Sequence, residues 1–192
     1  MDVEMRFEQL IKMPKDRIGV IIGRNGNVKE EIEKKCNVII EIDSENGDTI
    51  VSSGSASLAE SDVFKAIEIL TAISKGFSPN RAFRLFEEDL LQLIDIRSYT
   101  GRSDNSTKRI KGRLIGKDGK SRKTLEELTG ASISVYGHTV GLIGSFSEIR
   151  VATEAISMIF SGSPHKSVYA MLQIARRKAK LEKLKLWEQG SQ

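Results

Sequence analysis

Cysteine, histidine and aromatic residues are scarce in this chain of 192 residues, which limits the kinds of site that it can form. It has one cysteine and two histidines, so an internal disulfide is impossible, and no Cys/His spacing predicts a zinc site. Aromatic residues make up only 6%. No apolar run approaches the roughly 20 residues that cross a bilayer, and the N-terminal MDVEMRFEQL lacks an apolar signal core. We therefore expect a cytoplasmic globular protein without a metal or another cofactor.

The charges are distributed unevenly along the chain. Residues 1–80 carry ten Lys or Arg and 14 Asp or Glu, a balance of −4, whereas the remaining residues carry 20 and 12, a balance of +8. A polyanionic partner of the second half would explain this asymmetry. A basic surface that only maintains solubility would explain it equally well.

One pattern of residues occurs twice, at a displacement of 93 positions. The stretch IIGRNGNVKEEIEKKCNVIIEI begins at Ile21, and LIGKDGKSRKTLEELTGASISV begins at Leu114. Glycines, apolar positions and basic positions coincide, which indicates an internal repeat. Periodicity predicts the element order β-α-α-β-β-α in each copy. The expected strands cover residues 7–13, 37–43 and 48–54 in the first copy and 90–99, 131–137 and 139–145 in the second, and the closing helices cover 58–76 and 146–162.

Two Ser-Pro pairs divide the chain. Ser78-Pro79 and Ser163-Pro164 predict helix starts, with Ser as the N-cap and Pro at the first helical position. We expect an α+β protein with a first domain over 1–77, a linking helix and a second domain over 78–162, and a C-terminal basic helix and tail over 163–192. The basic face of that last helix is either solvated or an additional contact for nucleic acid or a partner.

Each copy contains a Gly-x-x-Gly turn between two helices. An ATPase-type phosphate loop is excluded, because its first glycine would have to stand at position 114, which is leucine, and because such a loop joins a strand to a helix. Paired glycines instead let another backbone approach closely. The second helix begins there, so its N–H groups and positive dipole end face the approaching group. This arrangement suits the phosphates of a single strand, with Arg24 and Lys117 adding positive charge.

The turn, the apolar residues around it and the element order resemble a type I KH domain in both copies. The resemblance implies a clamp on about four nucleotides of single-stranded RNA or DNA. We expect no catalysis, because no cluster of Asp, Glu and His in the sequence resembles the metal site of a nuclease. The expected RNA-binding residues of the first copy are Ile22, Gly23, Arg24, Asn25, Gly26, Val28, Lys29, Ile40 and Ile42. Those of the second copy are Arg109, Lys111, Arg113, Ile115, Gly116, Lys117, Asp118, Gly119, Lys120, Arg122, Lys123, Ile133 and Val135.

The two copies differ where RNA would pass. Asp118 places a negative charge in the second turn, opposite the neutral Asn25 of the first, and Ser121 replaces the apolar Val28. Asp118 disfavours the simplest phosphate clamp, although several basic residues surround it. We expect both turns to contribute to RNA binding; the alternative is that one of them has a purely structural or protein-binding role. Cys36 is expected to be a small core residue.

The whole chain, about residues 5–188, resembles a family of small-subunit ribosome-assembly factors, the archaeal relatives of the eukaryotic partner of Nob. The features that carry the resemblance are the two domains, the joining segment FSPNRAFRLFEEDLLQLIDI and the second Ser-Pro helix. It implies binding near the 3′ end of small-subunit rRNA, and contact with the endonuclease that trims that end and with a translation initiation factor subunit. The alternative is a protein-interaction scaffold with KH folds, in which RNA binding is limited to one domain.

Overall fold

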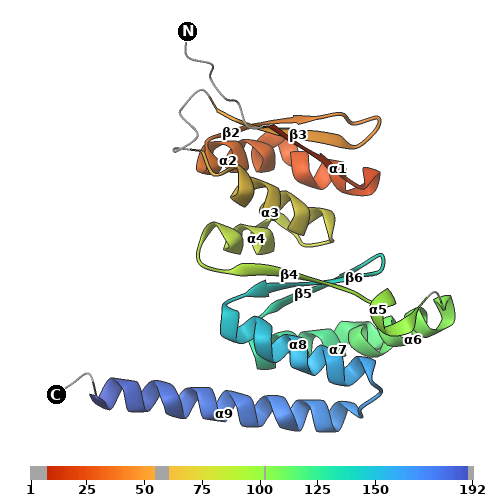
Figure 1. Cartoon of the computed structure of the whole chain (residues 1–192), viewed down its shortest axis with the longest axis vertical. Helices are drawn as coiled ribbons and strands as arrows, with labels where there is room; N and C mark the ends of the chain where they lie inside the picture. The colour runs from red at the N-terminus through yellow and green to blue at the C-terminus, as the bar shows by residue number, and fades with distance from the viewer. Residues whose placement is uncertain (1–7, 55–60, 102, 190–192) are drawn as a thin grey trace. The chain divides into compact units, whose positions relative to one another are not determined.

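The chain forms two compact units that divide between Leu91 and Gln92. The computed structural model describes residues 8–54, 61–101 and 103–189 (Figure 1). Within these residues, none of the helices combines the length and apolar character that a membrane span requires. The predicted domain limits at 77/78 and 162/163 stay a prediction.

The first unit is a three-stranded antiparallel sheet with helices against one face (Figure 1). The sheet has the order β1-β3-β2, so β1 and β2 are its edges. The elements are β1 (Glu8–Lys12), α1 (Lys15–Ile22), η1 (Arg24–Gly26), α2 (Asn27–Cys36), β2 (Val38–Ile42), β3 (Asp48–Ser53), α3 (Val63–Ser74), α4 (Pro79–Ala82) and η3 (Phe83–Phe86).

Burial in β2 follows the two-residue period of a strand. Val38 and Ile40 are buried, while Ile39 and Glu41 between them are exposed. One face of the sheet thus closes the core against the helices. Cys36, at the end of α2, is 2% exposed, which confirms its expected place in the core. Burial, helped by the nearby Asp62, raises the pKa of this thiol to about 11, so it stays protonated at neutral pH.

The second unit repeats this plan with the sheet order β4-β6-β5. Its elements are β4 (Leu90–Asp95), α5 (Arg97–Thr100), α6 (Asp104–Ile115), η4 (Lys117–Gly119), α7 (Lys120–Thr129), β5 (Ser132–Tyr136), β6 (Thr139–Gly144), α8 (Phe146–Phe160) and α9 (His165–Gln189). Helix α9 packs on α7 and α8 through Val168 and Leu172, which are fully buried. The predicted α+β fold with β-α-α-β-β-α in each copy is confirmed, apart from α5, an extra helical turn of the second unit.

The prediction of one strand over residues 90–99 is wrong at its end. The strand stops at Asp95, and residues 97–100 form α5 instead. The Asp95 carboxylate accepts the N–H of Arg97 at 2.9 Å, and Ile96 has helical backbone angles. A short acidic side chain that takes up a nearby N–H favours a helical turn over a strand, and the alternation of apolar residues did not reveal this competition.

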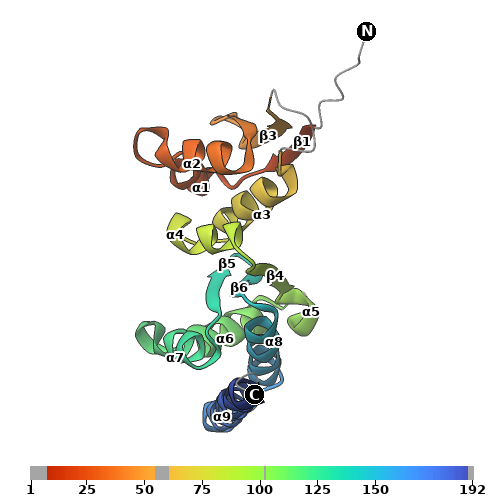
Figure 2. The ribbon, with the colours of Figure 1, turned by 90° about the vertical axis from the view of Figure 1, so that its left-hand side faces the viewer.

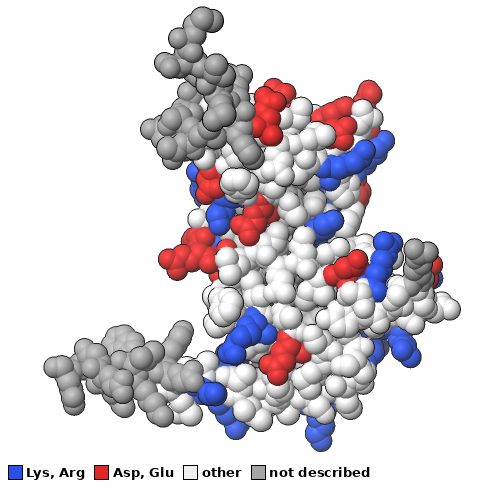
Figure 3. Space-filling model, in the orientation of Figure 1, with Lys and Arg blue, Asp and Glu red and all other residues white. Residues whose placement is uncertain are grey.

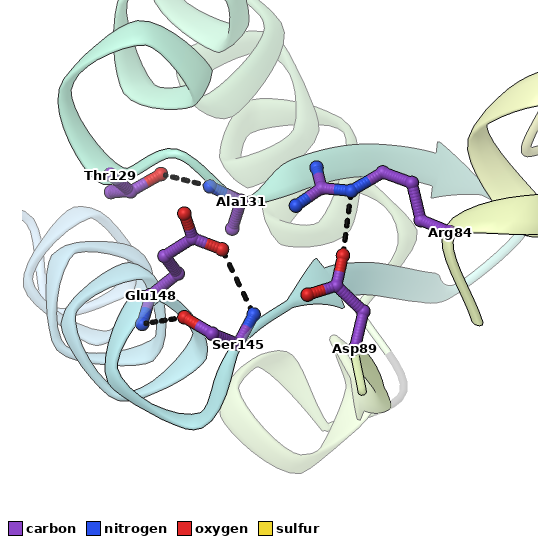
Figure 4. Close-up of polar contacts among 6 residues, drawn as sticks. All are labelled: Arg84, Asp89, Thr129, Ala131, Ser145 and Glu148. Atoms are coloured by element: carbon purple, nitrogen blue, oxygen red, sulfur yellow. Dashed lines mark hydrogen bonds and ion pairs between the residues drawn. The ribbon is translucent and has the colours of Figure 1, made fainter. Parts of the chain in front are cut away.

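Local hydrogen bonds fix the start of α8 (Figure 4). Ser145 Oγ accepts the N–H of Glu148, and Glu148 Oε2 accepts the N–H of Ser145, which is a capping box. Gly130 ends α7 with φ 84°, which favours glycine, and a Cβ there would lie 2.3 Å from Glu148 Oε1, so the Glu148 side chain of this cap would have to move. Figure 4 also shows Arg84 bound to Asp89 at 2.6 Å, a contact that belongs to the first unit.

The two Ser-Pro pairs both precede helices. Ser78 is the N-cap of α4 with Pro79 at its first position, as predicted. Helix α9 begins at His165, one residue later than predicted, and the Pro164 carbonyl accepts the N–H groups of Ser167 and Val168. Beyond Leu172 the helix loses its packing, and residues 176–181 are all exposed.

Candidate nucleic-acid interface

The two Gly-x-x-Gly turns have the same backbone conformation. Gly23 has φ 74° and ψ −176°, and Gly116 has φ 71° and ψ 177°. The third residue of each turn is left-handed although it is not glycine, with φ 55° at Asn25 and φ 54° at Asp118. Asn and Asp tolerate this region better than other side chains. The acidic substitution in the second turn therefore changes its charge and leaves its path unchanged.

Each turn leads directly into a helix whose first turn carries no side-chain cap. Gly26 and Gly119 are the N-caps of α2 and α7, and no side chain bonds to the leading N–H groups of either helix. Helix α8 contrasts with both, since Ser145 caps it. The N–H groups of Asn27 and Lys120 already donate to the carbonyls of Arg24 and Lys117. The N–H groups that follow them in the first turn of α2 and α7, with the positive end of each dipole, are the ones suited to an anion. Figure 2 shows that the turn joins adjacent helices, α1 with α2 and α6 with α7.

Most predicted polar contacts of the interface are exposed. Arg24 and Asn25 are exposed at the first turn. Lys29 is half-buried and lies 3.4 Å from Glu33. In the second unit the exposed members of the predicted set are Arg109, Lys117, Asp118, Lys120 and Lys123, and the half-buried members are Lys111 and Arg122. The Nε of Arg122 is buried and has no hydrogen-bond partner among the described residues.

The predicted apolar groove residues divide into two groups. Ile22, Val28 and Ile42 of the first unit are half-buried, as are Ile115 and Val135 of the second. Ile40 and Ile133 are 0% and 1% exposed, so the interpretation of their side chains as groove walls is wrong. Strand alternation turns these two side chains into the core; only their backbone atoms face outward.

Arg113 is engaged within its own unit, and its predicted contact with RNA is not supported. Its guanidinium donates to the carbonyl of Ile159 at 2.9 Å and to that of Ser163. The first unit has the same device at a different helix position, because Arg17 donates to Ile73 at 2.9 Å and to Phe77 at 2.6 Å. Each arginine ties the helix before its Gly-x-x-Gly turn to the carbonyl end of the last KH helix.

The two units use their cations differently. In the first unit Lys12, Lys29, Lys35 and Lys65 each lie within 4.0 Å of a carboxylate. Among the described residues of the second unit, no Lys or Arg forms such a pair. On the face drawn in Figure 3, both signs intermix over the first unit, and basic side chains edge the second unit near α9. The second unit therefore presents uncompensated positive charge beside its turn.

Two features near the turns were not predicted from the sequence. Glu33 and Glu126 each accept a backbone N–H from the neighbouring strand, at Ile40 and at Ile133. In the second unit Tyr169 of α9 donates to Ser121, at 3.2 Å. Ser121 replaces Val28 and is 7% exposed, so its hydroxyl serves a contact with α9. Glu33 and Glu126 are equivalent by the 93-residue repeat, the one clue the sequence offered.

Models of known domain families match both halves of the chain. A model described as eukaryotic type KH-domain (KH-domain type I) matches residues 90–177. A model described as KH domain matches residues 8–68. The prediction of two KH domains is thereby confirmed.

Known proteins are similar to this chain over most of its length. The chain is 44% identical to the KH domain-containing protein MJ0443 of Methanocaldococcus jannaschii over 186 residues, which is 95% of this chain and 80% of the relative. It is 28% identical to the RNA-binding protein pno1 of Dictyostelium discoideum over 174 residues, 90% of this chain and 73% of the relative. Among solved structures, it resembles aDim2p in the a/eIF2α–aDim2p–rRNA complex from Pyrococcus horikoshii, with a TM-score of 0.82, 41% identity, and coverage of 91% of this chain and 96% of that chain.

Proposed function

The chain belongs to the family of archaeal and eukaryotic two-KH-domain proteins that includes PNO1 and Dim2, and from this premise we propose how it binds RNA in ribosome biogenesis. Proteins of this family are non-catalytic RNA-binding proteins. We infer that the chain clamps a single strand near the 3′ end of small-subunit rRNA, in the cytoplasm. The phosphates lie on the turns at residues 23–26 and 116–119, and the bases face the strands β2 and β5.

The observation that carries this proposal is the pair of turns with the same backbone conformation, each followed by a helix that lacks a side-chain cap. Both turns follow the same backbone path between two glycines, and both end in a helix without a side-chain cap. Backbone N–H groups that converge on one point bind phosphate without regard to sequence. The exposed cations Arg24, Lys117 and Lys120 add the long-range attraction.

Two further partners follow from the family. The solved complex of aDim2p contains an initiation factor subunit, a/eIF2α, together with rRNA. We propose that the chain likewise contacts this initiation factor subunit, and that it contacts the endonuclease that trims the rRNA end. Bound at the 3′ end, the chain would deliver or restrain these partners at the site of processing.

The test is the affinity of charge-reversal variants for an RNA oligonucleotide that carries the 3′ end of small-subunit rRNA. The variants are Arg24→Asp with Asn25→Asp in the first turn, Lys117→Asp in the second, and all three together. At least one of the single-turn variants should bind the RNA tenfold or more weakly than the wild-type chain, because the reversed charge repels the phosphate that the turn holds. Lys34→Asp, an exposed position on α2 away from the turn, is the control, and circular dichroism checks the fold. Full affinity in the combined variant would reject the proposal.

A second candidate function has one specific observation in its favour. The outer face of the first unit's sheet exposes Leu10, Ile39 and Ile50 at 63%, 43% and 38%, and Leu10 and Ile50 are direct cross-strand neighbours. Exposed neighbouring apolar side chains are typical of protein-binding surfaces. The first unit would then act as a scaffold for a protein. Binding through this face should survive 0.5 M salt and be lost in Leu10→Asp, whereas RNA binding should show the opposite behaviour.

A further inference from the structure

One hydrogen bond occurs at the same place in both units. The N–H of Ile40 in β2 donates to Glu33 Oε1 of α2 at 2.8 Å. The N–H of Ile133 in β5 donates to Glu126 Oε1 of α7 at 2.7 Å. The donor and the acceptor of the first bond each lie 93 residues before their counterparts in the second, although the turns of the two domains differ in charge. A contact that recurs in this way points to a shared task.

The bond lies on an open strand edge. β2 and β5 are edge strands of their sheets, and Ile40 stands opposite Val51 while Ile133 stands opposite Leu142. In an antiparallel ladder the N–H and C=O of one residue point to the same side. The N–H of Ile40 meets a helix side chain instead of β3, so the carbonyl of Ile40 also faces the open edge. The same reasoning holds for Ile133.

The carboxylates lie about two helical turns beyond the Gly-x-x-Gly turns. Glu33 follows Gly26 by seven residues, and Glu126 follows Gly119 by seven. Seven residues are about two helical turns, or roughly 10 Å along the axis, and return to the same helix face. A base whose phosphate rests on the turn can therefore reach the carboxylate and the strand edge beside it.

A cation accompanies each carboxylate one turn earlier on the same helix. Lys29 Nζ lies 3.4 Å from Glu33. Its counterpart is Arg122, whose buried Nε has no hydrogen-bond partner in the described part of the chain. Residues at i and i+4 are neighbours on a helix surface. In the first unit the strand edge thus meets an acceptor-only and a donor-only group in contact, and in the second unit Arg122 stands at the equivalent helix position.

This arrangement distinguishes bases by their polar edges. A carboxylate accepts the amino group of cytosine, whose second amino hydrogen can reach the strand carbonyl, while the ring nitrogen and O2 accept from the cation. Uracil has the same ring but presents a carbonyl oxygen where cytosine has its amino group. That oxygen would face a carboxylate and a carbonyl, and buried acceptors left without donors are costly. Building on the proposed function, we propose that Glu33 and Glu126 select amino-bearing bases, cytosine in particular, and reject uracil.

The test compares the full chain's affinities for two ten-nucleotide homopolymers, oligo(C) and oligo(U), at neutral pH by fluorescence anisotropy. The wild-type chain should bind oligo(C) at least tenfold more tightly. In the double variant Glu33→Gln with Glu126→Gln, the ratio should fall about tenfold toward unity, because an amide can offer its NH₂ to the uracil oxygen. Gln retains an oxygen for the strand N–H, so the fold is preserved.

Glu30→Gln with Glu127→Gln is the matched control, since both residues are exposed on the same two helices and the charge change is identical. In this control the affinities for both homopolymers should change together and the ratio should stay constant. A wild-type ratio near one, or a ratio that the Glu33/Glu126 variant leaves unchanged, would overturn the inference while RNA binding stands. Failure of the wild-type chain to bind any single-stranded RNA would instead reject the proposed function itself.

Discussion

The two glycines of each turn have different physical roles. Gly116 has φ 71° and ψ 177°, a region that only glycine occupies readily, and a Cβ there would lie 2.7 Å from Ser121 Cβ. Gly23 is constrained in the same way, with Val28 Cγ2 at 2.5 Å. Gly119 is left-handed but has open space around its missing side chain. The first glycine is therefore a folding requirement, and the second keeps the surface clear for an incoming strand.

This difference gives a prediction that separates stability from binding. Gly116→Ala should destabilise the protein by about 3 kcal/mol, from backbone strain and overlap together. Gly119→Ala should cost only about 1 kcal/mol, the usual strain of a left-handed alanine, yet it should weaken RNA binding several-fold because its Cβ occupies the space of the phosphate chain. Urea unfolding and anisotropy measure the two effects. Equal stability losses in the two variants would contradict this assignment.

Arginines on the helix before the second turn illustrate how an element combines structure with function. Arg109 and Arg113 are one turn apart on α6, and both were expected to contact RNA from their spacing to the turn. Arg109 is exposed, whereas Arg113 binds the carbonyls of Ile159 and Ser163. Sequence spacing places a residue on a helix face, but it does not show which distant carbonyls that face will meet.

The expected outcome of alanine substitution therefore differs between these two arginines. Arg113→Ala should lower the free energy of unfolding by about 2 kcal/mol, because charge-assisted hydrogen bonds to half-buried carbonyls are lost. Arg109→Ala should leave stability within about 0.5 kcal/mol and lower RNA affinity. Arg17→Ala should match Arg113→Ala, since Arg17 holds the same end of α3. If the Arg113→Ala variant kept its stability but lost RNA affinity, the prediction that Arg113 contacts RNA would be correct after all.

The secondary structure was largely predictable from the sequence because it depends on local periodicity. The repeat, the turns and six strands followed from glycine positions and apolar alternation. The exception, α5, depends on one side-chain bond from Asp95. The burial of Ile40 and Ile133 was harder to foresee, since alternation shows which side of a strand a residue takes but not how closely the helices cover it. The contacts of Glu33 and Arg113 are tertiary, and no local pattern specifies them.

At the scale of the whole molecule, the two units differ in how many of their basic side chains are paired with carboxylates. Lysines of the first unit lie next to carboxylates, as at Lys12, Lys35 and Lys65, and such pairs release few counterions when RNA binds. The basic residues after the second turn have no such partners among the described residues. The net charge of +8 over the later residues thus acts mainly through one unit.

The salt dependence of RNA affinity should reveal this asymmetry. Replacing Lys117, Lys120 and Lys123 with alanine should reduce the slope of log affinity against log salt by about 2, since each lost phosphate contact on a single strand removes roughly 0.7. The triple variant at Lys12, Lys35 and Lys65 makes the same charge change at paired positions and should alter the slope by less than about 0.5. Similar slopes in both triple variants would show that only total charge matters.

The matching backbone angles of the two turns have a further consequence. Asn25 and Asp118 adopt nearly the same left-handed conformation, and the glycines on either side agree as well. The segments 23–26 and 116–119 are therefore exchangeable cassettes, and transplanting either into the other site should leave the host scaffold undisturbed. The charge of such a loop can therefore be changed through its two middle residues while its backbone path stays the same, so one scaffold can present either a neutral or an acidic turn to a bound strand.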